Sequence, residues 1–149
     1  MNKLYLALGF VAFGLAACNN TPTAPGVPTY NANLTSGKEI PAPTVPNDYK
    51  GAGSVKATWD GKKLTVTGNY AALTGPATAA HIHEGQPGVA GDPVCPLKVT
   101  ADATDNKKGT LSNDGDCALN EDKLRFGFYY VNIHTAANTS GEIRGQLTK

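Results

Sequence analysis

Charge of either sign is scarce in this sequence. Lys and Arg number 13 and Asp and Glu number 12 among 149 residues, so the formal net charge is +1. No segment gathers basic residues into a stripe that could follow a phosphate backbone, and no segment is an acidic run of the kind found in tails. The composition therefore argues against nucleic acid as a partner.

Long hydrophobic runs are absent except near the N-terminus. Residues 4–15 are apolar, which is too short a run for a permanent membrane span. Lys3 precedes this run and Ala16 and Ala17 follow it, a pattern that predicts a signal peptide over residues 1–17. Residues 15–18 also resemble a bacterial lipobox, and the resemblance implies cleavage before Cys18 and lipidation of Cys18. An ordinary secretory signal that ends before Cys18 is the alternative.

The segment after the signal peptide contains almost nothing that could be buried. Residues 18–29 are rich in Pro, Thr and Asn, which indicates a flexible tether, and residues 30–149 then form one domain. No Asp follows Cys18, which disfavours retention at the inner membrane. We therefore expect a lipid-anchored protein of the bacterial cell envelope, at the outer membrane, in the periplasm or on the cell surface.

Cysteine is rare and odd in number, with only Cys18, Cys95 and Cys117. If Cys18 carries lipid, the other two remain as one pair, and an exported compartment favours a disulfide between Cys95 and Cys117. The bond would close a loop of about twenty residues and stabilise the fold by roughly 3 kcal/mol. Two free buried thiols are the alternative.

No segment after residue 17 has a convincing helical period, and turn residues separate short runs rich in β-branched and aromatic residues. Asp60-Gly61 is a two-residue hairpin signal between two such runs, and Leu64 and Val66 alternate with threonines as in a strand with one wet face. About eight short strands predict an all-β fold, an antiparallel sandwich or flattened barrel. The predicted strands cover residues 30–34, 53–59, 63–70, 78–83, 97–100, 108–111, 124–134 and 142–147.

Aromatic residues make up only 7% of the chain. We expect Trp59, Phe126, Phe128 and Tyr130 to pack in the core or at its rim, and we assign them no chemistry. Residues 84–93 contain three glycines and two prolines, so they cannot form a regular strand. This loop begins directly after His83, and we expect it to shape the approach to that residue.

The three histidines of the chain fall in two short stretches. His81 and His83 share the predicted strand 78–83, where residues two apart point to the same face. His134 ends the predicted strand 124–134 and could bring a third imidazole from a neighbouring strand. Three imidazoles on a rigid sheet are a metal-binding pattern, with zinc as one candidate because three histidines and a water form catalytic zinc sites. Isolated core or surface histidines are the alternative.

Three motifs in the second half of the chain resemble the chordin-type (CHRD) domain family. They are residues 79–89 around the paired histidines, residues 130–135 ending just after His134, and residues 140–147 around Arg144. A weaker match at residues 34–41 fits the N-terminal pattern of that family. The resemblance covers residues 30–149 and implies an extracellular or cell-envelope domain, with little implied about activity.

A more distant resemblance is to the copper side of copper/zinc superoxide dismutases. That family combines a His-x-His strand, a distant histidine and a C-terminal arginine on an eight-stranded Greek-key barrel. The resemblance implies that His81, His83 and His134 bind copper and that Arg144 is catalytic, guiding and hydrogen-bonding the anion. The dismutase histidine that bridges copper and zinc has no match here, nor do the zinc ligands. Any such site would hold copper only, with water at an open position.

Two residues beside these motifs have plainer interpretations. Arg144 could be a strand-end cation that pairs with Glu142 or Asp116 at the surface. Glu84 could orient a ligand imidazole, but a solvated loop carboxylate is the simpler expectation.

Two hypotheses of function follow from the sequence. In the first, the chain is an envelope-anchored, copper-only enzyme of the superoxide dismutase type, with superoxide as its substrate. In the second, it is a copper carrier, or a binding and assembly module with envelope protein partners and structural histidines. The metal hypothesis requires three ring nitrogens that converge about 2.0–2.1 Å from one point. Structural histidines would diverge or bond to the backbone.

Overall fold

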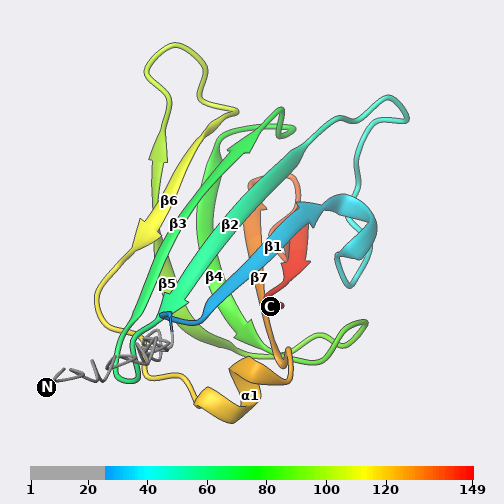
Figure 1. Cartoon of the computed structure of the whole chain (residues 1–149). Helices are drawn as coiled ribbons and strands as arrows, with labels where there is room; N and C mark the ends of the chain where they lie inside the picture. The colour runs from blue at the N-terminus through cyan, green and yellow to red at the C-terminus, as the bar shows by residue number, and fades with distance from the viewer. Residues whose placement is uncertain (1–25) are drawn as a thin grey trace, which may run out of the picture.

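Eight antiparallel strands close into a barrel in the computed structural model, which describes residues 26–149 (Figure 1). Their order around the barrel is β1-β2-β3-β6-β5-β4-β7-β8, and β8 pairs with β1. Because β4, β5 and β6 pair in succession and β3 lies beside β6, this part is a Greek key. The prediction of an all-β antiparallel fold is confirmed. The strands are β1 (Thr29–Thr35), β2 (Ala52–Trp59), β3 (Leu64–Ala71), β4 (Ala77–Glu84), β5 (Pro93–Ala101), β6 (Gly109–Asn113), β7 (Tyr129–Thr135) and β8 (Ile143–Gln146).

Alternate residues of the strands fill the barrel interior. In β3, Leu64 and Val66 are buried while the threonines between them are exposed, as the sequence pattern predicted. The predicted hairpin is confirmed: residues 60–63 connect β2 to β3, and the Asp60 N–H bonds to the Lys63 carbonyl at 3.3 Å around Gly61 and Lys62. The Asp60 carboxylate accepts the backbone N–H groups of Lys62 and Lys63, and these bonds stabilise the turn. Gly61 supplies the positive φ of 95° that this turn contains.

The predicted strand over residues 124–134 is only partly correct. A short helix, α1 (Glu121–Arg125), precedes β7, which begins at Tyr129. The Asn120 side chain caps this helix by accepting the N–H of Lys123, and a local cap of this kind outweighs the strand preference of the residues that follow. Phe126 is 69% exposed, so its expected place in the core or at its rim is wrong, whereas Trp59 and Tyr130 are buried.

Cys95 at the start of β5 is bonded to Cys117, which precedes α1, so the predicted disulfide is confirmed. The predicted signal peptide, Cys18 and most of the predicted tether lie outside the described residues. The described part begins at residue 26, and Pro28 accepts the backbone N–H of Trp59 just before β1 starts. Among residues 26–149, no helix has the length and apolar character needed to cross a membrane.

A second buried layer covers the outside of β4, β7 and β8. The core residues of these strands, such as Ile82, Ile133 and Ile143, point into the barrel, so their neighbours face outward. Several of these outward residues are nonetheless buried, including His83 and Arg144, because the loop after β4 (residues 85–92) folds over them. The candidate site lies in this layer, on the outer face of a rigid sheet.

Candidate metal centre

The strand register brings the three histidines together. β4 and β7 are paired so that His134 of β7 lies opposite Ala79 of β4, next to His81 along the strand. His83 lies opposite Tyr130, at the far side of His81 from His134. The outward faces of the two strands therefore carry all three imidazoles. Ring nitrogens of His81, His83 and His134 lie within 4.8 Å of one another. Two nitrogens bound to one metal ion lie at most about 4.1 Å apart, so the 4.8 Å bound is slightly wider than a closed metal site requires.

Backbone carbonyls hold two of the rings by one nitrogen each. His83 Nδ1 lies 2.8 Å from the Gly91 carbonyl oxygen, and His134 Nδ1 lies 2.9 Å from the Thr139 carbonyl oxygen. Because a carbonyl only accepts, Nδ1 must carry the proton in both rings. The lone pair is then on Nε2 of each ring, the tautomer that a metal ligand needs.

His81 completes the cluster through its other ring nitrogen. His81 Nδ1 lies 3.1 Å from His134 Nε2. Without a metal, this contact is a hydrogen bond in which His81 donates. In a metal site, these two nitrogens would both serve as ligands and would not bond to each other. The cluster therefore offers Nδ1 of His81 and Nε2 of His83 and His134.

The imidazoles are held in their neutral form. Burial is the main cause that lowers the pKa of all three below the ordinary value of 6.5. The neighbouring imidazoles lower the pKa of His81 further, and the Arg144 charge does the same for His83. Hydrogen bonds to the carbonyls of Gly91 and Thr139 act in the opposite direction without reversing the shift. Neutral rings are ready to bind a metal ion at physiological pH.

Tyr130 is a site residue that the sequence interpretation missed. Its ring stacks on that of His83, with centroids 4.9 Å apart and planes 14° apart, and its hydroxyl accepts the backbone N–H of Gly91. The guanidinium carbon of Arg144 lies 3.4 Å from the centroid of the same ring. Because Tyr130 pairs with His83 of β4 on one side and with β8 on the other, its ring separates Arg144 from His83. The aromatic run in the sequence offered no signal of this role, because the role depends on the strand register.

Arg144 is neither at the surface nor paired with the predicted acids. It is 2% exposed, and its Nη2 donates to the carbonyls of Gln86 and Val89. Asp116 instead pairs with Lys63 at 2.9 Å. Arg144 therefore fastens the loop that supplies the Gly91 carbonyl to His83. Its action on an incoming anion is not visible in these contacts and stays a prediction.

Two further residues clarify the surroundings of the cluster. Glu84 forms a salt bridge with Lys123 of α1, so it ties the end of β4 to the helix and does not orient an imidazole. Asn132 lies between His81 and Arg144 in the register and is almost fully buried, with its Oδ1 lacking a partner in the described part of the chain. The sequence interpretation overlooked Asn132 because an asparagine in a strand carries no chemical signature by itself.

The fold and the cluster define a class of protein, an all-β closed barrel that carries three neighbouring imidazoles on its outer face. This chain belongs to the CHRD domain family, whose family model matches residues 30–147. The family expected from the histidine and arginine motifs is thereby confirmed. Neither the curated proteins nor the solved structures yielded a significant match.

Proposed function

We propose that this chain binds one copper ion through His81, His83 and His134 and disproportionates superoxide in a bacterial cell envelope. The observation that carries the proposal is the convergence of three neutral ring nitrogens, two of them on rings fixed by backbone carbonyls. His83 Nε2 adds support because it is buried without a hydrogen-bond partner among residues 26–149. A buried lone pair without a partner costs free energy, and a metal ion would satisfy it.

Copper suits this ligand set best. Imidazole is a favourable copper ligand, and copper tops the affinity order of the first-row divalent metals. Zinc is the second candidate, because three histidines and a water also form catalytic zinc sites. Only copper could support superoxide turnover at this site, since zinc has no redox chemistry.

The chain's own residues would hold and orient the reactive centre. A bound copper ion would supply the one-electron redox chemistry that the disproportionation of superoxide needs. Gly91 and Thr139 keep their imidazoles from rotating, and Tyr130 packs flat against His83. Arg144 adds a positive charge one aromatic ring away, which would favour the approach of an anion.

A place in the cell envelope is proposed from the N-terminal sequence. The lipobox-like residues 15–18 would put a lipid on Cys18, and residues 18–29 would tether the domain to the membrane. The bond between Cys95 and Cys117 supports this, because stable disulfides are favoured in oxidising compartments.

A copper carrier without turnover is the second candidate function. It is favoured by the position of Arg144, whose guanidinium is occupied by loop carbonyls and is almost inaccessible. The buried guanidinium lies against the Tyr130 ring, so it presents no donor to an anion at the histidines. The carrier would use the same three histidines and would differ only in the absence of superoxide turnover.

The experiment combines metal binding with superoxide decay. Metal-free wild type, His83→Ala and Thr67→Ala would each receive one equivalent of copper(II), followed by a weak chelator and gel filtration. Thr67 is exposed on β3, remote from the histidines in the strand order, so its variant is the control. We expect one retained copper ion in wild type and in Thr67→Ala, and none in His83→Ala. Superoxide decay after pulse radiolysis should be accelerated only by the loaded proteins.

Three outcomes are informative. Retained copper with accelerated decay supports the dismutase function. Retained copper without accelerated decay replaces it by the carrier. Equal retention by wild type and His83→Ala would refute both functions, since neither survives without the three-histidine site.

A further inference from the structure

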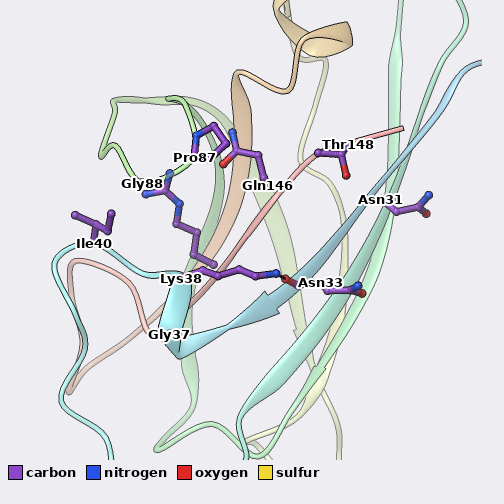
Figure 2. Close-up of a pocket in the computed structure, with 10 residues that line it drawn as sticks. Asn31, Asn33, Gly37, Lys38, Ile40, Pro87, Gly88, Gln146 and Thr148 are labelled. Atoms are coloured by element: carbon purple, nitrogen blue, oxygen red, sulfur yellow. Dashed lines mark hydrogen bonds between the residues drawn. The ribbon is translucent and has the colours of Figure 1, made fainter.

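A cavity lies beside the candidate metal centre, on the outer face where β8 meets β1. It has a volume of about 570 Å³, and Figure 2 shows the side chains that line it. Its walls are the loop after β4, through Pro87 and Gly88, and the 3-10 helix η1 (Ser36–Lys38) with the nearby Ile40. No histidine lines the cavity. Its properties can therefore be assessed independently of any metal.

The floor of the cavity is a grid of polar side chains on two paired strands. Thr35 of β1 lies opposite Arg144 of β8, and Asn31 lies opposite Thr148. The residues between them, Asn33 and Gln146, face the same side because side chains alternate along a strand. Figure 2 shows Asn31 and Asn33 on β1, with Gln146 and Thr148 on the neighbouring segment. Amide side chains both donate and accept, as the hydroxyl groups of a sugar do.

Positive charge is only partly compensated at one end of this grid. Lys38 and Arg144 line the cavity, no carboxylate does, and neither cation forms a salt bridge within residues 26–149. The Lys38 ammonium donates one hydrogen bond, to the Asn33 carbonyl at 2.8 Å, and keeps two further donors. Glu39 is buried behind the wall against Gly141 and offsets part of the Arg144 charge, but it does not reach the lining.

We propose that this cavity binds an acidic sugar unit, a hydroxyl-rich ring that bears one carboxylate. The carboxylate would lie at the Lys38 end, where the ammonium keeps two donors for charge-assisted hydrogen bonds and the buried Arg144 adds positive charge. The ring hydroxyls would bond to the amides of the floor, and the apolar C–H faces of the ring would pack between Ile40 and Pro87. The volume is within the range of small-molecule sites and accommodates one or two sugar rings.

The test uses the metal-free protein, so it does not depend on copper binding. Glucuronate, glucose and acetate would be titrated separately while the protein's amide NMR signals and binding heat are followed. Glucuronate combines both recognised features, whereas glucose lacks the charge and acetate lacks the hydroxyls. We expect saturable binding of glucuronate, at least about tenfold tighter than that of either control, with shifts confined to β1, β8 and the two walls.

Variants identify the cavity as the binding site. Lys38→Gln should weaken glucuronate binding about tenfold and leave glucose binding unchanged, since it removes one charge-assisted bond. Asn33→Ala should weaken both sugars. Lys62→Gln, an exposed lysine in the turn between β2 and β3, is the charge-matched control and should bind as wild type does.

Several results would overturn the proposal. Acetate bound as tightly as glucuronate would show a general anion site, and glucose bound as tightly would remove the role of the two cations. Failure of glucuronate to saturate below about 10 mM, or an unchanged affinity in Lys38→Gln, would reject the cavity as an acidic-sugar site. Because all samples are metal-free, none of these results bears on the copper proposal.

Discussion

His81→Ala is the most selective perturbation of the candidate metal centre. His81 is half-buried, and its ring has no hydrogen bond to the backbone among the described residues, only the contact with His134. The metal-free variant should therefore unfold within about 0.5 kcal/mol of wild type. His134→Ala also loses the bond to the Thr139 carbonyl, so it should lose about 1 kcal/mol.

The effect on copper binding should be far larger than the effect on metal-free stability. Loss of a residue that only supports a ligand already weakens metal binding by about 10-fold to 100-fold, so loss of a ligand should exceed 100-fold. At copper concentrations 100 times the dissociation constant, binding stabilises the folded state by about 2.7 kcal/mol. A 100-fold weaker site leaves about 0.4 kcal/mol. At about 4 °C per kcal/mol for a domain of this size, the copper-induced rise in Tm should fall from about 11 °C to about 2 °C.

Thermal unfolding with and without copper measures this difference directly. Wild type and His81→Ala would be compared at equal copper concentrations, with Thr67→Ala as the control for substitution on an exposed strand face. A copper titration of the folded proteins at 25 °C would confirm the affinities. An equal copper-induced rise in Tm for wild type and His81→Ala would refute the convergence of three ligands on one ion.

Four further predictions concern Glu142, the Cys95–Cys117 bond, Tyr130 and Cys18. Burial alone would raise the pKa of Glu142, but hydrogen bonds from Thr135, Thr74 and Tyr49 outweigh burial and lower that pKa below 4.5. The stabilisation is therefore present above pH 4.5 and is lost as the pH falls through the lowered pKa. Glu142→Gln should lower the free energy of unfolding by about 2–3 kcal/mol at pH 7. In urea unfolding, the variant should lose less of its free energy of unfolding between pH 7 and pH 3 than wild type does. Reduction of the Cys95–Cys117 bond should cost about 3 kcal/mol in the same assay, because the bond joins residues 22 apart. Tyr130→Leu should weaken copper binding about tenfold by removing the ring against His83, with fold retention checked by circular dichroism. Cys18→Ser should move the expressed protein from the membrane fraction to the soluble fraction, and an unchanged membrane fraction would contradict the lipid anchor.

The strands could be predicted where the sequence pattern is local. Alternation in residues 64–67 and the turn residues Asp60 and Gly61 depend on near neighbours, so both hairpin strands were predicted within about a residue of their bounds. Helix α1 could not be predicted in this way, since it depends on one cap from Asn120 and is too short to have a period.

The histidines of the site could be predicted because spacing along one strand fixes a shared face. The surroundings of the histidines could not, because they depend on pairings between distant segments. Tyr130 acquires its role only when β7 pairs with β4, and Arg144 is buried only when the loop after β4 folds over β8. From the sequence alone, an arginine at the end of a strand that binds loop carbonyls cannot be distinguished from one that is exposed at the surface.

The pairing of β8 with β1 affects how neighbouring copies of the protein can associate. Thr35 pairs with Arg144, and a second bridge joins Asn31 to Thr148, so the ring of strands in residues 26–149 has no open side. An open sheet edge offers unpaired backbone groups to a neighbouring chain and is a template for aggregation. Many copies held close to one another would therefore meet through side chains and loops, with no route to edge-to-edge strand addition while the barrel stays closed.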